Sequence, residues 1–345
     1  MAEEQRKQGG PPVRSFTMTF DEPAYDEREA AAAVAAHLGC EHTELPAGSS
    51  LVGLLDDYLR GFGEPFGNPT ALLIHDLSRK AREHVTVALV GDGGDEVFAG
   101  YPRYKGGLLA AGYRRIPAWL RRGVMAPAGL IPESSRGRHG LRRAREFLTG
   151  ANLPDAEMYA AWVEYFDPGE RRDLLGLNGE PGRPIAELYA GAPSQSPLDA
   201  MQQTDLQSFL PGNLLAYGDA MSMAHSLELR LPLIDHRLIE TVQQLSSATR
   251  WGGGLKSLLK GAARLLLPAD IVERPKRGFN PPMGVWLKTD LKDMLGDLLT
   301  AENLAGVGIE PPAVERLLAE QRRGLRDNAL KVWALLVLVA RKRAL

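Results

Sequence analysis

The sequence predicts an α/β protein in which a parallel sheet is followed by a large, mostly helical part. Two β-prone segments, Ser15–Phe20 and Glu41–Leu45, flank an alanine-rich helical segment, and this strand–helix–strand order predicts a right-handed crossover and parallel pairing. A third segment, Val85–Val90, is an unbroken apolar run typical of a buried parallel strand. After Tyr104 the pattern turns helical, which places a helical elaboration towards the carboxyl end of the chain.

The first crossover has local signals at both ends. Asp26 and Glu29 have the spacing of a capping box, and the helix is expected to run to Leu38, where Gly39 stops it. Residues 1–13 are polar and rich in Gly and Pro, so we expect a disordered lead-in. One domain then covers 14–345, with an α/β nucleotide-binding part at 14–104 and a mostly helical part at 105–345.

The remaining elements are helices. Two are expected before the third strand, at Leu51–Gly61 and Thr70–His84. The Gly-, Pro-, Ala- and Ser-rich stretch Gly176–Pro197 is typical of an irregular connection. The later helices are expected at Asp199–Leu210, Asp235–Leu245, Lys256–Leu267, Val285–Leu298, Pro312–Arg322 and Asp327–Arg343.

Composition limits the classes of partner. The formal net charge of −2 over 345 residues gives no general attraction to nucleic acid. The longest apolar run, Trp333–Ala340, is too short to cross a membrane. A single cysteine, Cys40, fits a reducing compartment, so we expect a cytoplasmic protein without nucleic-acid or membrane partners.

The richest chemistry follows the third strand. Three carboxylates and several glycines stand where this strand ends, and ligands of open α/β sheets bind at the carboxyl ends of strands. Glycine lets backbone N–H groups approach an anion closely, and carboxylates can hold Mg²⁺. The alternative is a tight acidic turn on the surface. The stretch reads Val90, Gly91, Asp92, Gly93, Gly94, Asp95, Glu96, Val97, Phe98, Ala99, Gly100 and Tyr101, and we call it the acidic loop.

This loop resembles a segment of the synthetase domain of the asparagine synthetase family, and other motifs extend the resemblance from about Arg14 to the C-terminus. In order, the matching segments are Ser15–Phe20 with Tyr25–Glu27, Gly63–Thr70, the acidic loop, Met221–His236 and Arg274–Phe279. Several ordered motifs make chance similarity improbable.

The resemblance implies a sheet of the adenine nucleotide alpha-hydrolase or ATP-pyrophosphatase type, with ATP and Mg²⁺ bound at its edge. The family activates a carboxylate with ATP as an acyl-adenylate, and an amine, usually ammonia, then displaces AMP. By the motifs, Asp95 would bind Mg²⁺ with pyrophosphate, Asp92 and Glu96 would frame the site, and Lys276 would stabilise charge at the adenylate. The nucleotide side would be formed by Met18, Val90, Gly91, Gly93, Gly94 and Asp95, and the acceptor pocket by Asp219, Ser222 and Tyr101.

Some motif residues have plain structural interpretations. Lys276 is otherwise a surface lysine in a basic turn. Glu228 and Arg230 are expected to form a structural ion pair, and His225 and His236 to satisfy local backbone groups.

The chain also departs from the family pattern. Residue 2 is Ala2 where the family's glutaminase domain begins with a cysteine, and the family's phosphate-binding Ser-Gly-Gly-x-Asp-Ser sequence does not occur. The chain is therefore expected to begin just downstream of that loop, as a truncated form. Val90 stands where Ser or Thr is frequent, and Tyr217 and Ala220 stand where Lys and Arg are common.

These observations predict an asparagine synthase-like ligase domain that forms amides from a small-molecule carboxylate and an ammonia donor. A separate glutaminase or a loop-supplying chain is the expected protein partner. Two alternatives stay open: an amidotransferase acting on another carboxylate such as a sugar acid, and an inactive remnant that serves as a binding module.

Overall fold

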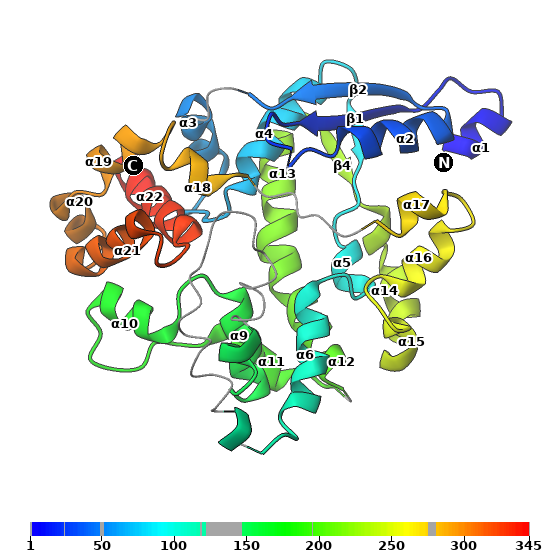
Figure 1. Ribbon diagram of the computed structural model, residues 1–345. Coiled ribbons are helices and arrows are strands. Elements are labelled where there is room, and N and C mark those ends of the chain that lie inside the picture. Colours follow the sequence, from blue (N-terminus) through cyan, green and yellow to red (C-terminus); the bar gives the residue numbers. More distant parts are fainter. Residues whose placement is uncertain are drawn as a thin grey trace.

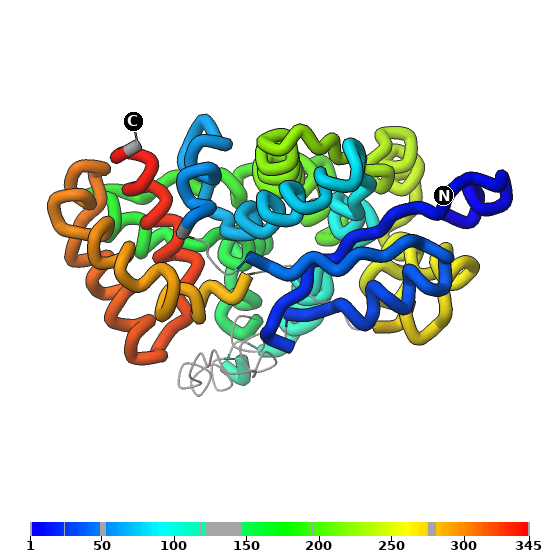
Figure 2. The backbone as a smooth tube through the Cα atoms, turned by 90° about the horizontal axis from the view of Figure 1, so that it is seen from above, coloured from blue at the N-terminus to red at the C-terminus, as the bar shows by residue number. Residues whose placement is uncertain are grey.

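The computed structural model describes residues 2–344 except 24, 49–51, 118, 122–146, 195 and 275–280. Strands β1 (Arg14–Thr19) and β2 (Glu41–Pro46) lie across the top of Figure 1, and α13 (Ala216–Met223) runs down the centre. Helices α19–α22 (residues 292–344) stand on one side of α13 and α14–α17 (residues 236–272) on the other, while α6 (Pro102–Tyr113) and α9–α12 (residues 155–207) lie below the strands. The view from above in Figure 2 shows both termini at the periphery.

The first crossover forms as expected. Strand β1 (Arg14–Thr19) pairs in parallel with β2 (Glu41–Pro46), with Arg14 opposite Glu41. Helix α2 (Arg28–Leu38) connects them and ends at Gly39, whose φ of 68° is left-handed. The expected capping box is absent, because the Asp26 carboxylate instead accepts from the Arg28 backbone N–H at 3.3 Å and from its guanidinium.

The strands divide into two parallel pairs instead of one sheet. Strand β3 (Val87–Leu89) pairs with β4 (Glu228–Arg230), which the sequence did not predict as a strand. Among the described residues, β1 and β3 each have one strand neighbour only. The Arg14 guanidinium donates to the carbonyl of His84 at 2.9 Å, so the amino ends of the two pairs are in contact.

One helix supports both strand pairs. Helix α4 (Thr70–Ala81) contributes Ala81 to a buried cluster with Leu45 of β2 and Leu227, which precedes β4. On β3, the side chains of Val87 and Leu89 are 42% and 47% exposed. Each pair is therefore covered from the α4 side, and β3 carries apolar side chains to the surface on its other face.

The largest core lies among helices from distant parts of the chain. Trp333, Tyr58 and Met221 are fully buried in it. They belong to α22 (Ala329–Ala344), α3 (Val52–Gly61) and α13 (Ala216–Met223). The long C-terminal helix therefore packs onto the core.

Several predicted helices form with shifted ends, whereas the helices at 155–163, 168–175, 247–251, 269–272 and 301–306 were not predicted individually. The predicted helix at 285–298 is divided in two, and a helix occurs inside the predicted irregular connection at 184–191. The elements are α5 (Gly94–Val97), α6 (Pro102–Tyr113), α9 (Asp155–Val163), α10 (Pro168–Leu175), α11 (Pro184–Gly191), α12 (Pro197–Gln207), the π-helical turn η1 (Leu210–Leu215), the 3-10 turn η2 (Pro232–Ile234), α14 (His236–Gln243), α15 (Ser247–Trp251), α16 (Ser257–Ala263), α17 (Ala269–Val272), α18 (Met283–Trp286), α19 (Lys292–Leu298), α20 (Ala301–Gly306) and α21 (Pro311–Arg323).

The lead-in is a correction to the sequence-based expectation. Residues of the predicted disordered segment form helix α1 (Ala2–Lys7). Its acidic first turn and basic last turn suit the helix dipole, and the Lys7 ammonium lies 2.9 Å from the Glu3 carboxylate.

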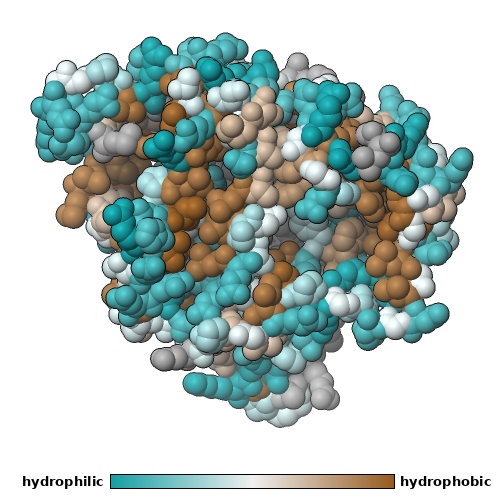
Figure 3. Space-filling model, turned by 180° about the vertical axis from the view of Figure 1, so that it is seen from behind, coloured by the Kyte–Doolittle hydropathy of each residue, from teal (hydrophilic) through white to brown (hydrophobic). Residues whose placement is uncertain are grey.

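The surface is mixed in polarity. Figure 3 shows streaks of apolar residues between polar ones on the face opposite that of Figure 1. Among the residues that the structure describes, no helix is long and apolar enough to span a bilayer.

Candidate functional site

The acidic loop lies at the carboxyl end of β3, and its glycines have different tasks. Gly93 has a φ of 83°, and a Cβ there would lie 1.9 Å from Cγ2 of Ile234. A Cβ on Gly94 would lie 2.8 Å from Cδ1 of Leu233. These two glycines therefore let the loop pack against η2. Gly91 is exposed, and a Cβ placed on it would meet no described atom within 4 Å beyond its neighbours in the sequence, so it is the glycine that faces open space.

The three carboxylates of the loop have different surroundings. Asp92 is half-buried, and burial together with the negative charge of Asp95 raises its pKa. Glu96 is fully buried, and burial raises the pKa of its carboxyl although a hydrogen bond from Tyr101 opposes the shift. The Tyr101 hydroxyl donates to Oε1 of Glu96 at 2.6 Å, while Oε2 of Glu96 has no hydrogen-bond partner in the described part of the chain.

A lysine far along the chain contacts the loop. The Nζ of Lys256 lies 3.1 Å from Oδ1 of Asp95, with the two side chains 30% and 22% exposed. Its positive charge also opposes the rise in the pKa of Asp92. Among the described residues, Lys256 is thus the cationic side chain that contacts a carboxylate of the acidic loop. The sequence did not single out Lys256.

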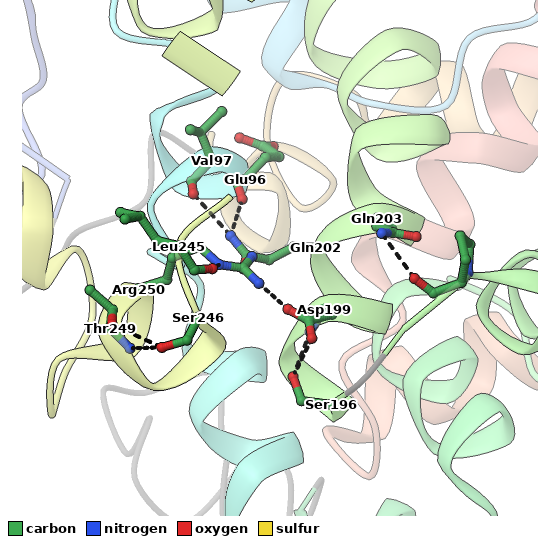
Figure 4. A network of polar contacts seen from close by, with 11 residues as sticks. Glu96, Val97, Ser196, Asp199, Gln202, Gln203, Leu245, Ser246, Thr249 and Arg250 are labelled. Carbon is green, nitrogen blue, oxygen red and sulfur yellow. Dashed lines mark hydrogen bonds and ion pairs between the residues drawn. The ribbon is translucent and has the colours of Figure 1, made fainter. Parts of the chain in front are cut away.

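A buried polar network holds α5 from behind, as Figure 4 shows. The Gln202 amide donates to the backbone carbonyls of Glu96 and Val97 at 2.7 and 3.0 Å. The Arg250 guanidinium donates to Oε1 of Gln202 at 2.5 Å and forms an ion pair with Asp199. Arg250 is 6% exposed, so α12 and α15 together fix the short helix that carries Asp95 and Glu96.

Aromatic rings surround the guanidinium of Arg103, and one of them belongs to Tyr101, the hydrogen-bond donor to Glu96. The Arg103 guanidinium lies 3.8 Å from the Tyr101 ring centre and 4.9 Å from that of Phe209. It also forms an ion pair with the fully buried Asp205 at 2.7 Å. Tyr101 is therefore held between Arg103 and Glu96. It has a structural role in addition to any role in substrate binding.

A tyrosine completes the described surroundings of the carboxylates. Tyr217 of α13 is 7% exposed, and burial followed by the charges of Asp92 and Glu96 raises the pKa of its phenol. This is one of the positions where the family frequently has a cation. The site consequently has a neutral hydroxyl near its acids at that position.

The structure places the other predicted site residues as follows. Met18 is buried near the end of β1 and packs with Phe20 and Leu73, so only its backbone is available to a ligand. The hydroxyl of the buried Ser222 is 3.4 Å from the carbonyl of Asp219, whose own side chain is exposed. Ser222 is thus engaged within α13.

Val90 and Lys276 are the remaining predicted site residues. Val90 leads into the loop and donates its N–H to the carbonyl of Arg230 at 3.0 Å, which continues the β3–β4 ladder. Lys276 lies outside the described residues.

The arrangement suits a magnesium ion that is shared with phosphates. Burial and, next to it, the negative charge of Asp95 raise the pKa of Asp92, and a divalent cation held by these carboxylates would offset that charge. Proteins usually hold Mg²⁺ through one or two carboxylates plus substrate phosphates. Among the described residues, no group of three or more His, Cys, Asp or Glu side chains is arranged to hold a metal ion.

Comparison with known proteins finds one matching family model and several similar proteins. The family model described as asparagine synthase matches residues 1–342. The asparagine synthetase (glutamine-hydrolysing) 1 of Bacillus subtilis is 28% identical over 337 residues, which is 96% of this chain and 52% of the relative. A putative asparagine synthetase of Mycobacterium bovis is 29% identical over 336 residues, or 95% of this chain and 50% of the relative.

More distant similarity reaches proteins with a different printed name. The amidase chyE of Penicillium rubens is 23% identical over 277 residues, which is 69% of this chain and 39% of that protein. The chain therefore spans about half the length of the first two relatives and less of the amidase.

Proposed function

Because this chain belongs to the asparagine synthase family, we propose that it takes part in ATP-dependent amide formation. The observation that carries the proposal is the acidic loop at the carboxyl end of β3, where Asp92 and Asp95 lie with Lys256 beside Asp95. Parallel strands present such loops to nucleotides, and paired carboxylates suit Mg²⁺ with phosphate.

The proposed chemistry has two transfers. A carboxylate oxygen of the substrate attacks the α-phosphorus of ATP, the bond to the β-phosphate oxygen breaks, and pyrophosphate leaves. The nitrogen of ammonia then attacks the acyl carbon, AMP leaves with the bonding electrons, and the nitrogen loses a proton. Negative charge on the phosphates must be stabilised during the first transfer.

Residues of this chain would divide that work. Asp92 and Asp95 would hold a Mg²⁺ ion, which supplies charge neutralisation to the departing pyrophosphate. The backbone at Met18 and Gly91 would receive the nucleoside, since Gly91 faces open space. Lys276 would stabilise charge on the reacting phosphorus. Glu96 would keep Tyr101 in place through its 2.6 Å hydrogen bond.

We further propose that the β1–β2 and β3–β4 pairs are parts of one ATP-pyrophosphatase-type sheet, completed by a strand and phosphate-binding loop that a separate chain or segment supplies. All four strands run in parallel pairs, and both pairs pack on the α4 side. In the described part of the chain, β1 and β3 each have one edge without a strand neighbour, and these two edges would accept one parallel strand between them. The Arg14–His84 contact at their amino ends would then be replaced.

The test compares the chain alone with the chain fused to a strand–loop–helix segment containing Ser-Gly-Gly-x-Asp-Ser. Pyrophosphate release with aspartate, ammonia and Mg²⁺-ATP is measured, together with hydroxamate formation when hydroxylamine replaces ammonia. We expect release near 1 s⁻¹ or above, a rate typical of enzymes, only in the fusion. A fusion that melts at a higher temperature but releases no pyrophosphate would contradict ligase chemistry and favour a binding module.

A second acceptor is favoured by one observation. Tyr217 is buried with its phenol near Asp92 and Glu96, at a position where the family often has a lysine. A neutral hydroxyl there would bind an aspartate carboxylate less well than a cation does. We therefore propose a carboxylate other than aspartate, such as a sugar acid, as the alternative acceptor. The same hydroxamate assay on a panel of sugar acids and amino acids decides between aspartate and another acceptor. Hydroxamate formed from aspartate alone would exclude the alternative acceptor.

A further inference from the structure

We propose that Lys256 is a built-in competitor for the cation position at Asp95, so that a divalent metal ion binds there only by displacing the lysine ammonium. This inference rests on the proposed function in one respect, because it takes Asp95 to be a metal ligand. The geometric basis is the 3.1 Å approach of the Lys256 Nζ to Oδ1 of Asp95.

The backbone at Lys256 indicates that its side chain is needed there. Lys256 has a φ of 54°, in the left-handed region that favours glycine. Among the described residues, the other non-glycine residues with positive φ are Ala99 and Ser226. The Lys256 N–H donates to the carbonyl of Ala99 at 3.4 Å, so Lys256 meets a second residue of positive φ within the acidic loop. Such outliers gather at functional sites.

The neighbouring chain is shaped to admit the lysine. A Cβ on Gly100 would lie 1.9 Å from Oδ1 of Asp95 and 2.5 Å from Cε of Lys256. The absence of a side chain at Gly100 is therefore what allows the ammonium to reach the carboxylate. On the other side, Ser257 donates its hydroxyl to the carbonyl of Arg250 at 3.2 Å, which ties the lysine to the network behind α5.

The pair is also open enough to exchange. Both side chains keep part of their surface in water, at 30% for Lys256 and 22% for Asp95. A partly exposed pair is weak, so a divalent ion that offers twice the charge can replace the ammonium.

The experiment measures binding of Mn²⁺ alone, by calorimetric titration and by electron paramagnetic resonance of the free ion. Lys256→Met removes the ammonium and keeps the length of the side chain. Lys256→Gly removes the ammonium and also relieves the left-handed backbone, so it tests the same idea in a variant that is not expected to lose stability. We expect both variants to bind Mn²⁺ roughly five-fold more tightly than the natural chain, the upper range for losing a partly exposed pair.

Two further variants separate the possible explanations. Lys260→Met removes a positive charge from the same helix, where Lys260 contacts Glu273 at 3.4 Å, and should leave Mn²⁺ affinity unchanged. Asp95→Asn should weaken binding strongly. If Asp95→Asn has no effect, the proposed metal role of Asp95 itself fails. If Asp95→Asn weakens binding but neither Lys256 variant tightens it beyond Lys260→Met, only the competition by Lys256 is overturned.

Discussion

Replacement of Arg250 tests whether the acidic loop is held in place from behind. Arg250 lies 48 residues from its partner Gln202 in the sequence, and its guanidinium is the link between Gln202 and Asp199. In Arg250→Met the apolar stem is kept while every polar contact of the head is lost. Gln202 then loses the donor to its Oε1, and the Asp199 carboxylate, 15% exposed, loses its counter-ion.

The expected loss of stability follows from this burial. Removing one partner of a buried ion pair costs about 3–5 kcal/mol, because an uncompensated charge stays behind. An unfolding entropy of about 2.1 cal/mol/K per residue gives roughly 0.7 kcal/mol/K for a chain of 345 residues. The melting temperature of Arg250→Met should therefore fall by roughly 4–7 °C.

The assay is a thermal melt followed by circular dichroism, with Arg237→Met as the matched control. Arg237 also has an aspartate partner, Asp235 at 2.8 Å, but its side chain is 79% exposed. An exposed pair is worth at most about 1 kcal/mol, so the control should move by no more than about 1.5 °C. If the two variants melt at the same temperature, the network in Figure 4 does not hold α5 as argued.

Three other substitutions have outcomes of predictable sign. The Nε2 atoms of His75 and His225 lie 3.1 Å apart, and burial lowers the pKa of both rings. The unfolded state, with a pKa near 6.5, then binds more protons, so their contribution is complete above about pH 6.5 and is lost as the pH falls towards the folded-state pKa. The fall in melting temperature from pH 8 to 5 should shrink in His225→Gln, and an unchanged fall would refute this linkage. Gly100→Ala should lower the free energy of unfolding in urea by about 1–3 kcal/mol, because its Cβ would meet Oδ1 of Asp95 at 1.9 Å. Gly112→Ala, on an open helical surface, should instead stabilise by about 0.5–1 kcal/mol, and equal effects of the two alanines would count against the steric argument.

The elements that the sequence predicts well are those with local signals. Gly39 ends α2 in the left-handed conformation that its position suggested, and β1 and β2 pair in parallel across that helix. Strand β4 was missed because it has three residues, two of them charged. The ion pair within it was nevertheless predicted, and Arg230 donates to Glu228 at 2.8 Å. Helix α11 was missed because it is only 8 residues long and begins with a proline and ends with a glycine, residues that usually indicate loops.

Local sequence signals also reveal only part of the candidate site. The acidic loop could be found from the sequence, because glycines and carboxylates follow an apolar strand. Lys256 and Arg250 could not, since their role depends on a chain that returns to the loop about 150 residues later. One signal was present: a run of three glycines precedes Lys256 and allows the tight return. His225 was expected to satisfy local backbone groups, and it contacts His75 instead.

The acidic loop is not stable in its position by itself, so its conformation depends on contacts from the surrounding elements. Helix α5 is four residues long, too short to be stable by its own hydrogen bonds. Burial raises the pKa of Asp92 and Glu96, which means that their charged forms oppose folding at neutral pH. Contacts from Gln202 and Tyr101 offset that cost from outside the helix. The buried carboxylates therefore depend on contacts from outside α5 to stay in place at the carboxyl end of β3.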